Sequence, residues 1–148
     1  MQVRRIVSAA AILSLVLITT GCVTVSVASP EQTRKALAAG NVADKALVYF
    51  MAPQIGGFIL NIAVNGRIVG KVKDRTFIYC YFDPGSYDLT TDGQFPITSK
   101  WKTLMAVESN STYYIITPYG PPRFNEPASS RRVLSEYYSL SEHMNCGP

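Results

Sequence analysis

Few side chains in this sequence can act as a nucleophile, a general base or a soft metal ligand. The chain has one histidine, His143, near its end, and three cysteines. A Ser-His-Asp or Cys-His arrangement needs a histidine to accept the proton, and a structural zinc site needs four cysteine or histidine ligands. We therefore interpret His143 as a solvated or helix-capping residue. The sequence predicts no catalytic residue of this kind, no metal site and no cofactor.

The acidic residues could support two other chemistries, calcium binding and the hydrolysis of sugars. Asp83, Asp88 and Asp92 flank a Pro-Gly turn and the next loop, but their spacing does not match an EF-hand loop, and turns favour Asp for its hydrogen bonds to the backbone. Glu108 is the acidic residue with the most apolar context, at the end of a predicted strand. A cell-wall hydrolase that uses Glu108 or Asp88 is the least favoured function, and we expect a protein that is not an enzyme.

Aromatic side chains are the remaining candidates for a binding surface. Neighbouring residues of a strand point to opposite faces, so some of these rings must lie at the surface. Exposed Tyr or Trp rings can stack on a glycan or anchor a protein partner, although packing in the core or at its rim is the commoner role. The candidates are Tyr79, Tyr81, Trp101, Tyr113, Tyr114 and Tyr119.

The first 22 residues have the pattern of an export signal. Arg4 and Arg5 precede an apolar run over residues 6–18, which is too short to span a bilayer, and the run leads to Thr19-Thr20-Gly21-Cys22. This ending resembles the lipobox of bacterial lipoproteins. The resemblance implies cleavage before Cys22, acylation of its sulfur and anchoring in a membrane through the acyl chains. The alternative is an ordinary signal peptide with a cysteine nearby.

The residue after Cys22 predicts which of the two bacterial membranes holds the anchor. Val23 stands where an Asp would resemble an inner-membrane retention signal, which favours the periplasmic face of the outer membrane.

Without residues 1–21 the 148-residue chain keeps 127 residues, enough for one domain. Its small basic excess does not indicate nucleic acid as a partner. The pairs Lys71 with Lys73 and Lys100 with Lys102 predict a solvated sheet face, or contact with anionic lipid or peptidoglycan.

Cys80 and Cys146 remain after Cys22 is assigned to the anchor. The periplasm is a compartment in which disulfides persist, and a bridge between them would close a loop of about 66 residues. Against a bridge, free cysteines are often buried, and nothing in the sequence places the two residues close together. Both alternatives stay open at this stage.

The middle of the chain has the pattern of consecutive β-strands. Short runs rich in Val, Ile, Tyr and Phe alternate with Gly, Asn, Asp and Pro. Asn65-Gly66 is the strongest turn signal, since two-residue hairpins favour this dipeptide. The spacing predicts a mainly β protein, an antiparallel β-sandwich of about seven strands. The strands are expected at residues 46–51, 58–64, 67–72, 76–82, 87–91, 97–108 and 112–117.

Helices are expected on both sides of this core. Ser29-Pro30-Glu31-Gln32 is typical of a capping box, and it predicts a short helix that Gly40 ends. Prolines between residues 118 and 127 argue against strand pairing there. Residues 128–144 place Val133, Tyr137, Leu140 and Met144 on one helical face, which favours a docking helix, with a strand as the alternative. We predict a signal peptide (1–21), a lipidated tether with a short helix (22–44), a sandwich core (45–118) and a Pro-rich loop with a C-terminal helix or tail (119–148).

The turn and strand motifs of residues 45–117 carry a family resemblance. They are the runs 46–51 and 62–70, the run 81–89 around Pro84-Gly85, and Tyr113-Tyr114-Ile115. Together they resemble a family of small bacterial lipoproteins with a domain of unknown function, and their central part is similar to PEGA-type modules. The resemblance implies a prealbumin-like β-sandwich and supplies no catalytic residue.

These observations predict a non-enzymatic lipoprotein at the periplasmic face of the outer membrane. Its domain would serve as a protein-interaction or scaffolding module with an envelope protein as partner, in an envelope or secretion complex. The alternative is a module that binds peptidoglycan or another glycan through surface aromatics.

Overall fold

The computed structural model describes residues 24–94 and 99–146, so Cys22 and the predicted signal peptide lie outside the described residues. Two helices and nine strands form within these ranges. In chain order they are α1 (Pro30–Leu37), β1 (Ala46–Ala52), β2 (Leu60–Val64), β3 (Arg67–Val72), β4 (Thr76–Phe82), β5 (Gly85–Gly93), β6 (Lys100–Val107), β7 (Thr112–Ile116), β8 (Arg123–Asn125), α2 (Pro127–Tyr137) and β9 (Ser139–Leu140).

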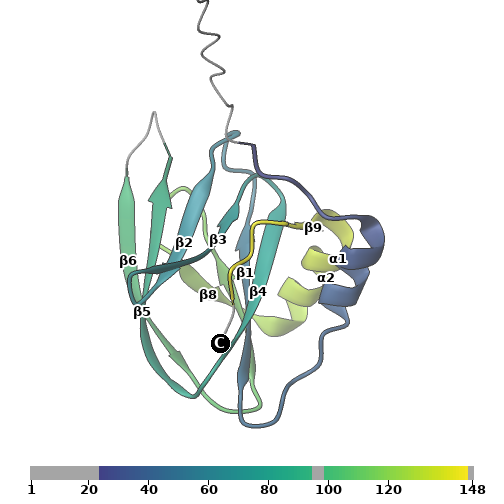
Figure 1. Ribbon diagram of the computed structural model, residues 1–148, viewed down its shortest axis with the longest axis vertical. Coiled ribbons are helices and arrows are strands. Elements are labelled where there is room, and N and C mark those ends of the chain that lie inside the picture. Colours follow the sequence, from purple (N-terminus) through teal and green to yellow (C-terminus); the bar gives the residue numbers. More distant parts are fainter. Residues whose placement is uncertain (1–23, 95–98, 147–148) are drawn as a thin grey trace, which may run out of the picture.

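The elements form three layers, a four-stranded sheet, a five-stranded sheet and a helical layer (Figure 1). The four-stranded sheet has the order β3-β2-β5-β6 and the five-stranded sheet the order β8-β7-β1-β4-β9. Both helices cover the outer face of the five-stranded sheet. The predicted β-sandwich is confirmed. Its five-stranded sheet is mixed rather than purely antiparallel, because β7 pairs with β1, and β9 with β4, in parallel.

The central strand β1 is buried along its whole length because both of its faces pack against another layer. Val48 and Phe50 point into the core between the sheets, whereas Leu47 and Tyr49 pack in the core beneath the helices. This explains why its sequence is almost continuously apolar, as is typical of a strand covered on both faces.

The Asn65-Gly66 hairpin forms as predicted between β2 and β3. Both residues have positive φ, 48° and 80°, as a type I′ turn requires. The Asn65 side chain also accepts a hydrogen bond of 2.8 Å from the backbone N–H of Asp88 in β5. The turn therefore fixes the register of β3 and ties the hairpin to the next strand of its sheet.

The N-terminal segment packs against the domain. Ser29 and Gln32 form the predicted capping box, and α1 buries Thr33 and Ala36. Before the helix, Val25 is only 2% exposed, and the backbone N–H of Ala28 donates to the Leu140 carbonyl at 2.9 Å. The described part of the segment predicted as a tether thus contributes to the core.

The C-terminal third differs from the prediction in two respects. The Pro-rich stretch was expected to hold no strand, but β8 pairs with β7 because it lies between Pro122 and Pro127, with no proline inside it. The predicted helix over 128–144 is also wrong in extent. It ends at Tyr137, whose side chain is 60% exposed, and the chain continues as β9 along the edge of β4.

The tail after β9 is attached to both sheets. Cys146 forms a disulfide with Cys80 of β4, which decides the open alternative in favour of the bridge. The Lys71 N–H donates to the His143 carbonyl at 2.9 Å. This approach requires a glycine at position 70, since a Cβ there would lie 2.6 Å from the His143 oxygen and 2.6 Å from Cδ1 of Ile78.

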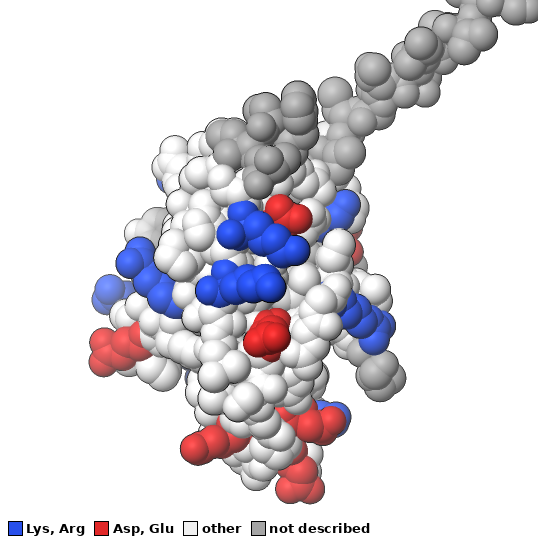
Figure 2. All heavy atoms as spheres, turned by 90° about the vertical axis from the view of Figure 1, so that its left-hand side faces the viewer, with Lys and Arg blue, Asp and Glu red and all other residues white. Residues whose placement is uncertain are grey.

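The outer edge of the four-stranded sheet has an uneven charge distribution (Figure 2). Most Lys and Arg side chains of this face lie in its upper part, and its lower end carries mostly Asp and Glu. Lys100 and Lys102 of β6 are exposed, as the prediction of a solvated sheet face required. Lys71 and Lys73 are half-buried.

Candidate functional site

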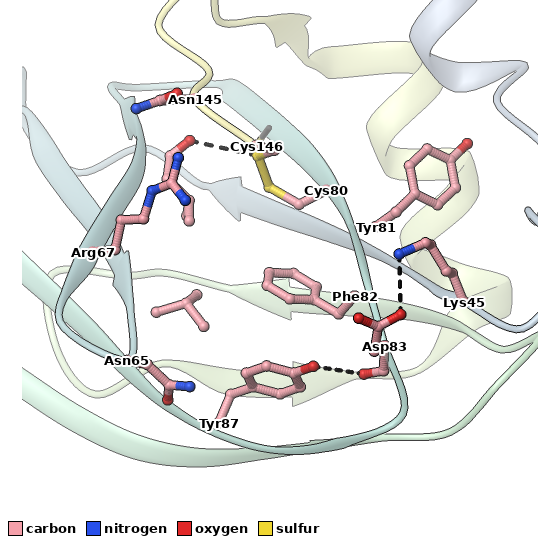
Figure 3. A pocket seen from close by; sticks show the side chains of 12 residues that line it. Lys45, Asn65, Arg67, Cys80, Tyr81, Phe82, Asp83, Tyr87, Asn145 and Cys146 are labelled. Atoms are coloured by element: carbon pink, nitrogen blue, oxygen red, sulfur yellow. Dashed lines mark hydrogen bonds and ion pairs between the residues drawn. A yellow bond between two sulfur atoms is a disulfide. The ribbon is translucent and has the colours of Figure 1, made fainter. Parts of the chain in front are cut away.

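The best-formed hollow lies beside the disulfide, between the β2–β3 hairpin, the end of β4 and the tail (Figure 3). Its volume is about 240 Å³. Arg67 reaches toward the disulfide from one side, and Lys45 and Asp83 lie on the other, with the Phe82 ring between them. The lining residues are Lys45, Val64, Asn65, Arg67, Val69, Cys80, Tyr81, Phe82, Asp83, Tyr87, Asn145 and Cys146.

Asp83 organises one wall of this hollow. Its carboxylate pairs with Lys45 Nζ at 3.0 Å, and its carbonyl accepts a hydrogen bond of 2.7 Å from the Tyr87 hydroxyl. The ion pair is solvent-exposed, so it adds little to stability, although it neutralises the lysine. Arg67 makes no ion pair with another described residue. The hollow therefore offers a guanidinium beside an apolar floor, which suits the anionic end of a small ligand.

Acid–base chemistry has little support in this hollow. Both sulfur atoms are held in the disulfide, which leaves no thiol. Burial, and then the neighbouring Tyr79, raise the pKa of Tyr81, so its phenol is neutral at physiological pH. The Tyr81 hydroxyl donates a hydrogen bond of 2.9 Å to the Gly40 carbonyl, which is a structural role.

The six aromatic residues predicted as a binding surface lie in three separate places. The first is beneath the helices, where Tyr79, Tyr81 and Tyr114 pack around Tyr49. Tyr49 and Tyr114 stack with ring centres 5.2 Å apart, and the Tyr49 hydroxyl donates to the Ala36 carbonyl at 3.0 Å. Burial raises the pKa of Tyr49 and Tyr114. Tyr114 is buried, so this group is mainly part of the core.

The second place is the opposite face of β7. The Tyr113 ring packs edge-on against Phe124, with centres 5.9 Å apart. Its hydroxyl accepts a hydrogen bond of 3.0 Å from the Glu108 backbone N–H. Tyr113 therefore fixes the connection between β6 and β7, and Glu108, considered for hydrolysis, is an exposed residue of that connection.

The third place is one end of the sandwich, where three rings form what we call the aromatic end cluster, Phe58, Trp101 and Tyr119. The Trp101 and Tyr119 rings meet edge-to-face at 5.0 Å, and Tyr119 lies 5.3 Å from Phe58. Phe58 and Trp101 are half-buried, and Tyr119 is 37% exposed. Of the six predicted aromatics, the structure thus brings Trp101 and Tyr119 together at this end, while the half-buried Tyr79 and Tyr81 meet edge-to-face at 6.3 Å beside the helices.

A groove between the two helices was not identified from the sequence. Arg34 of α1 and the pair Arg131-Arg132 of α2 line it, with a volume of about 640 Å³. None of the three arginines forms an ion pair with a residue in the described ranges. The remaining lining residues are small or apolar, namely Leu37, Ala38, Ala128 and Ser135. We call this the interhelical arginine groove.

One arginine of the groove acts electrostatically on the tyrosines beneath the helices. Burial raises the pKa of Tyr114, and the positive charge of Arg131 opposes this rise. The only available sequence signal was the Arg131-Arg132 pair. Nothing local indicates that it lies beside Arg34, which is about a hundred residues away in the chain.

The residues considered for metal chemistry are dispersed. Within residues 24–94 and 99–146, no three His, Cys, Asp or Glu side chains lie close enough to hold a metal ion. Asp83 belongs to the disulfide hollow, Asp88 is exposed on β5, and Asp92 is paired in register with Lys100. His143 is exposed in the tail.

No helix in the described part of the chain has the length and apolar character needed to cross a membrane. Comparisons with known proteins add no family assignment. No protein-family model matches the chain, and neither a curated protein nor a solved structure matches it significantly. The resemblance to small lipoproteins and PEGA-type modules stays a prediction from the sequence motifs.

Proposed function

We propose that this chain is a lipoprotein of the bacterial envelope, anchored at the periplasmic face of the outer membrane through acyl chains on Cys22. The lipobox-like ending at Cys22 is the main support. The Cys80–Cys146 disulfide supports export independently, because such bonds persist in oxidising compartments and are rare in the cytosol. Because Cys80 and Cys146 are bonded to each other, Cys22 has no cysteine of the same chain left to form a disulfide with.

The anchored domain is a non-enzymatic interaction module, and the interhelical arginine groove is the observation that carries this role. Three arginines line it without an ion-pair partner among the described residues, beside the apolar Leu37 side chain. Arginine binds carboxylates through two parallel hydrogen bonds and is enriched at protein interfaces. The groove fits an acidic segment of an envelope protein, whose carboxylates would pair with the arginines.

Crosslinking in intact cells followed by purification of the acylated protein tests this proposal. The unmodified protein should recover one specific partner, and Arg131→Glu/Arg132→Glu should lose it. Lys35→Glu is the matched control, because Lys35 is an exposed cation of α1 that pairs with Glu31 and does not line the groove. Equal recovery by all three proteins would refute the groove as the interaction site.

Mass spectrometry of the native protein tests the anchor separately. The expected mass is that of a chain beginning at Cys22, with added acyl groups and with two hydrogens removed by the disulfide. A chain cleaved elsewhere, or one without lipid, would refute the anchoring proposal and leave the groove proposal standing.

A glycan-binding module is the alternative, favoured by the aromatic end cluster. Trp101 and Tyr119 are partly exposed at one end of the sandwich, and a sugar stacks on the face of such a ring. Sedimentation with purified peptidoglycan separates the two functions. If the alternative holds, Trp101→Ala reduces binding, whereas Tyr137→Ala on the exposed side of α2 does not.

A further inference from the structure

We propose that the end of the sandwich that carries the aromatic end cluster lies directly against the membrane, as a lipid-contacting surface. The inference rests on the proposed acylation of Cys22. We call this surface the membrane-facing end and define it by Phe58, Lys73, Lys100, Trp101, Lys102 and Tyr119. The argument combines the length of the tether, the position of its attachment and the residues around it.

The tether is too short to hold the domain away from the bilayer. Val25 is already buried in the domain, at 2% exposure. Cys22 precedes it by three residues, and three residues of extended chain span about 10 Å. The acylated residue must therefore lie within about 10 Å of the protein surface at Val25. The domain has no long linker on which to turn, so one fixed end must face the lipid.

The point of attachment identifies that end. Thr24 and Val25 line a small hollow together with Gly57, Ile59 and Lys73, which belong to the loop after β1 and to the turn between β3 and β4. In Figure 1 the first described residues lie at the top of the sandwich, where β1 ends and β4 begins. The start of β1 and the turn between β6 and β7 lie at the opposite end.

The aromatic end cluster extends to one side of this attachment point. Phe58 stands between Gly57 and Ile59 of the hollow, and its ring contacts Tyr119, which in turn contacts Trp101. Trp and Tyr are enriched where proteins meet the polar region of a bilayer, because their rings combine an apolar body with a polar edge. A partly exposed Trp-Tyr pair beside the anchor has the composition expected of a surface in contact with lipid headgroups.

The charge distribution agrees with this orientation. Lys100 and Lys102 are exposed at the start of β6 and Lys73 lies beside Thr24, whereas the opposite end carries exposed carboxylates (Figure 2). Those are Asp44, Asp83, Asp88 and Glu108. Two acidic residues, Asp74 and Asp92, lie near the lysines. Asp74 accepts hydrogen bonds from backbone N–H groups, and Asp92 is in register with Lys100. The remaining lysines favour contact with anionic headgroups.

The position of the single tryptophan makes the inference directly measurable. Trp101 is the only tryptophan of the sequence, so its fluorescence reports this end alone. The native acylated protein is reconstituted into vesicles of phosphatidylethanolamine and phosphatidylglycerol, with its lipidation verified by mass. We expect lipids with brominated acyl chains to quench Trp101, and its quenching by aqueous acrylamide to fall by about twofold or more relative to the protein cleaved from its anchor.

A tryptophan at the far end supplies the matched control. Trp101→Phe/Val42→Trp moves the reporter to an exposed position just before the start of β1, beside the turn between β6 and β7. Its fluorescence should be insensitive to brominated lipid and equally open to acrylamide on and off the vesicle. Acylated protein whose Trp101 is as accessible as this control would overturn the inference while leaving the anchor intact. Absence of lipid on Cys22 would instead overturn the proposed function on which the inference rests.

Discussion

Reduction of the Cys80–Cys146 disulfide should remove a large part of the stability of the domain. The bridge closes a loop of 66 residues, for which the chain-entropy relation gives about 4 kcal/mol of stabilisation. Domains of this size have a free energy of unfolding of about 5–15 kcal/mol, so the loss is a substantial fraction. With a urea slope of about 2 kcal/mol/M, the midpoint of unfolding should fall by about 2 M.

Urea unfolding of the native protein in detergent, with and without dithiothreitol, measures this effect without changing a side chain. Cys146→Ser is the control, because its midpoint should be low and independent of the reductant. A fall in the unfolding free energy of less than about 1 kcal/mol would refute the reasoning. It would show that the backbone hydrogen bonds of the tail, such as Lys71 N–H to the His143 carbonyl, hold the loop closed without the bridge.

Three further perturbations test the packing. Gly70→Ala should lower the free energy of unfolding by about 1–3 kcal/mol through overpacking, whereas Gly40→Ala, with nothing within 4 Å of the added Cβ, should not. Thr91→Val should raise the free energy of unfolding, measured in urea, by about 1 kcal/mol, because the buried Thr91 hydroxyl has no hydrogen-bond partner among the described residues. Thr117→Val should lower this free energy, because it removes the 3.0 Å hydrogen bond from the Thr117 hydroxyl to the Met51 carbonyl. Since burial raises the folded-state pKa of Tyr49 above its ordinary value near 10, the contribution of Tyr49 to stability should be constant below pH 10 and be lost as the pH rises above it. Tyr49→Phe should flatten that fall in unfolding curves measured across the alkaline range.

The parts of the fold that the sequence predicts correctly are those governed by local interactions. The Asn65-Gly66 turn forms because its backbone needs positive φ at two adjacent residues. The helix starting at Pro30 forms because Ser29 and Gln32 satisfy each other's backbone N–H groups. In both cases the interacting residues are within three positions of one another, so the sequence pattern contains the whole cause.

The incorrect or missing parts depend on partners far away in the chain. Residues after Tyr137 keep a helical apolar spacing, yet they form β9 because the edge of β4 offers backbone groups to pair with. The parallel pairing of β1 with β7 joins segments about 65 residues apart, and no local pattern encodes it. An edge strand of three residues such as β8 also gives too short a pattern to recognise.

The same distinction between local and distant interactions applies to the candidate sites. The sequence identifies which side chains are aromatic or basic, but their grouping depends on the packing of separate elements. Tyr113 and Tyr114 are adjacent and nevertheless belong to opposite faces of β7. Trp101 and Tyr119 meet only because β6 and the segment after β7 end at the same place. The interhelical arginine groove exists only once α1 and α2 are packed side by side.

The two ends of the described chain form one structural unit. The N-terminal segment is bonded to the tail, since Ala28 N–H donates to the Leu140 carbonyl and Val27 forms a bridge with Ser141. The tail in turn pairs with β4 at only two positions, which is a weak attachment by backbone bonds alone. Cys146 adds a covalent bond to β4 a few residues further along. The segment that starts at residue 24 is therefore linked to β4 through the tail, in addition to the chain that continues from it through α1 into β1. The disulfide reinforces this link, because without it only the short β9 pairing and the backbone bonds of the tail would join the tail to the sheets.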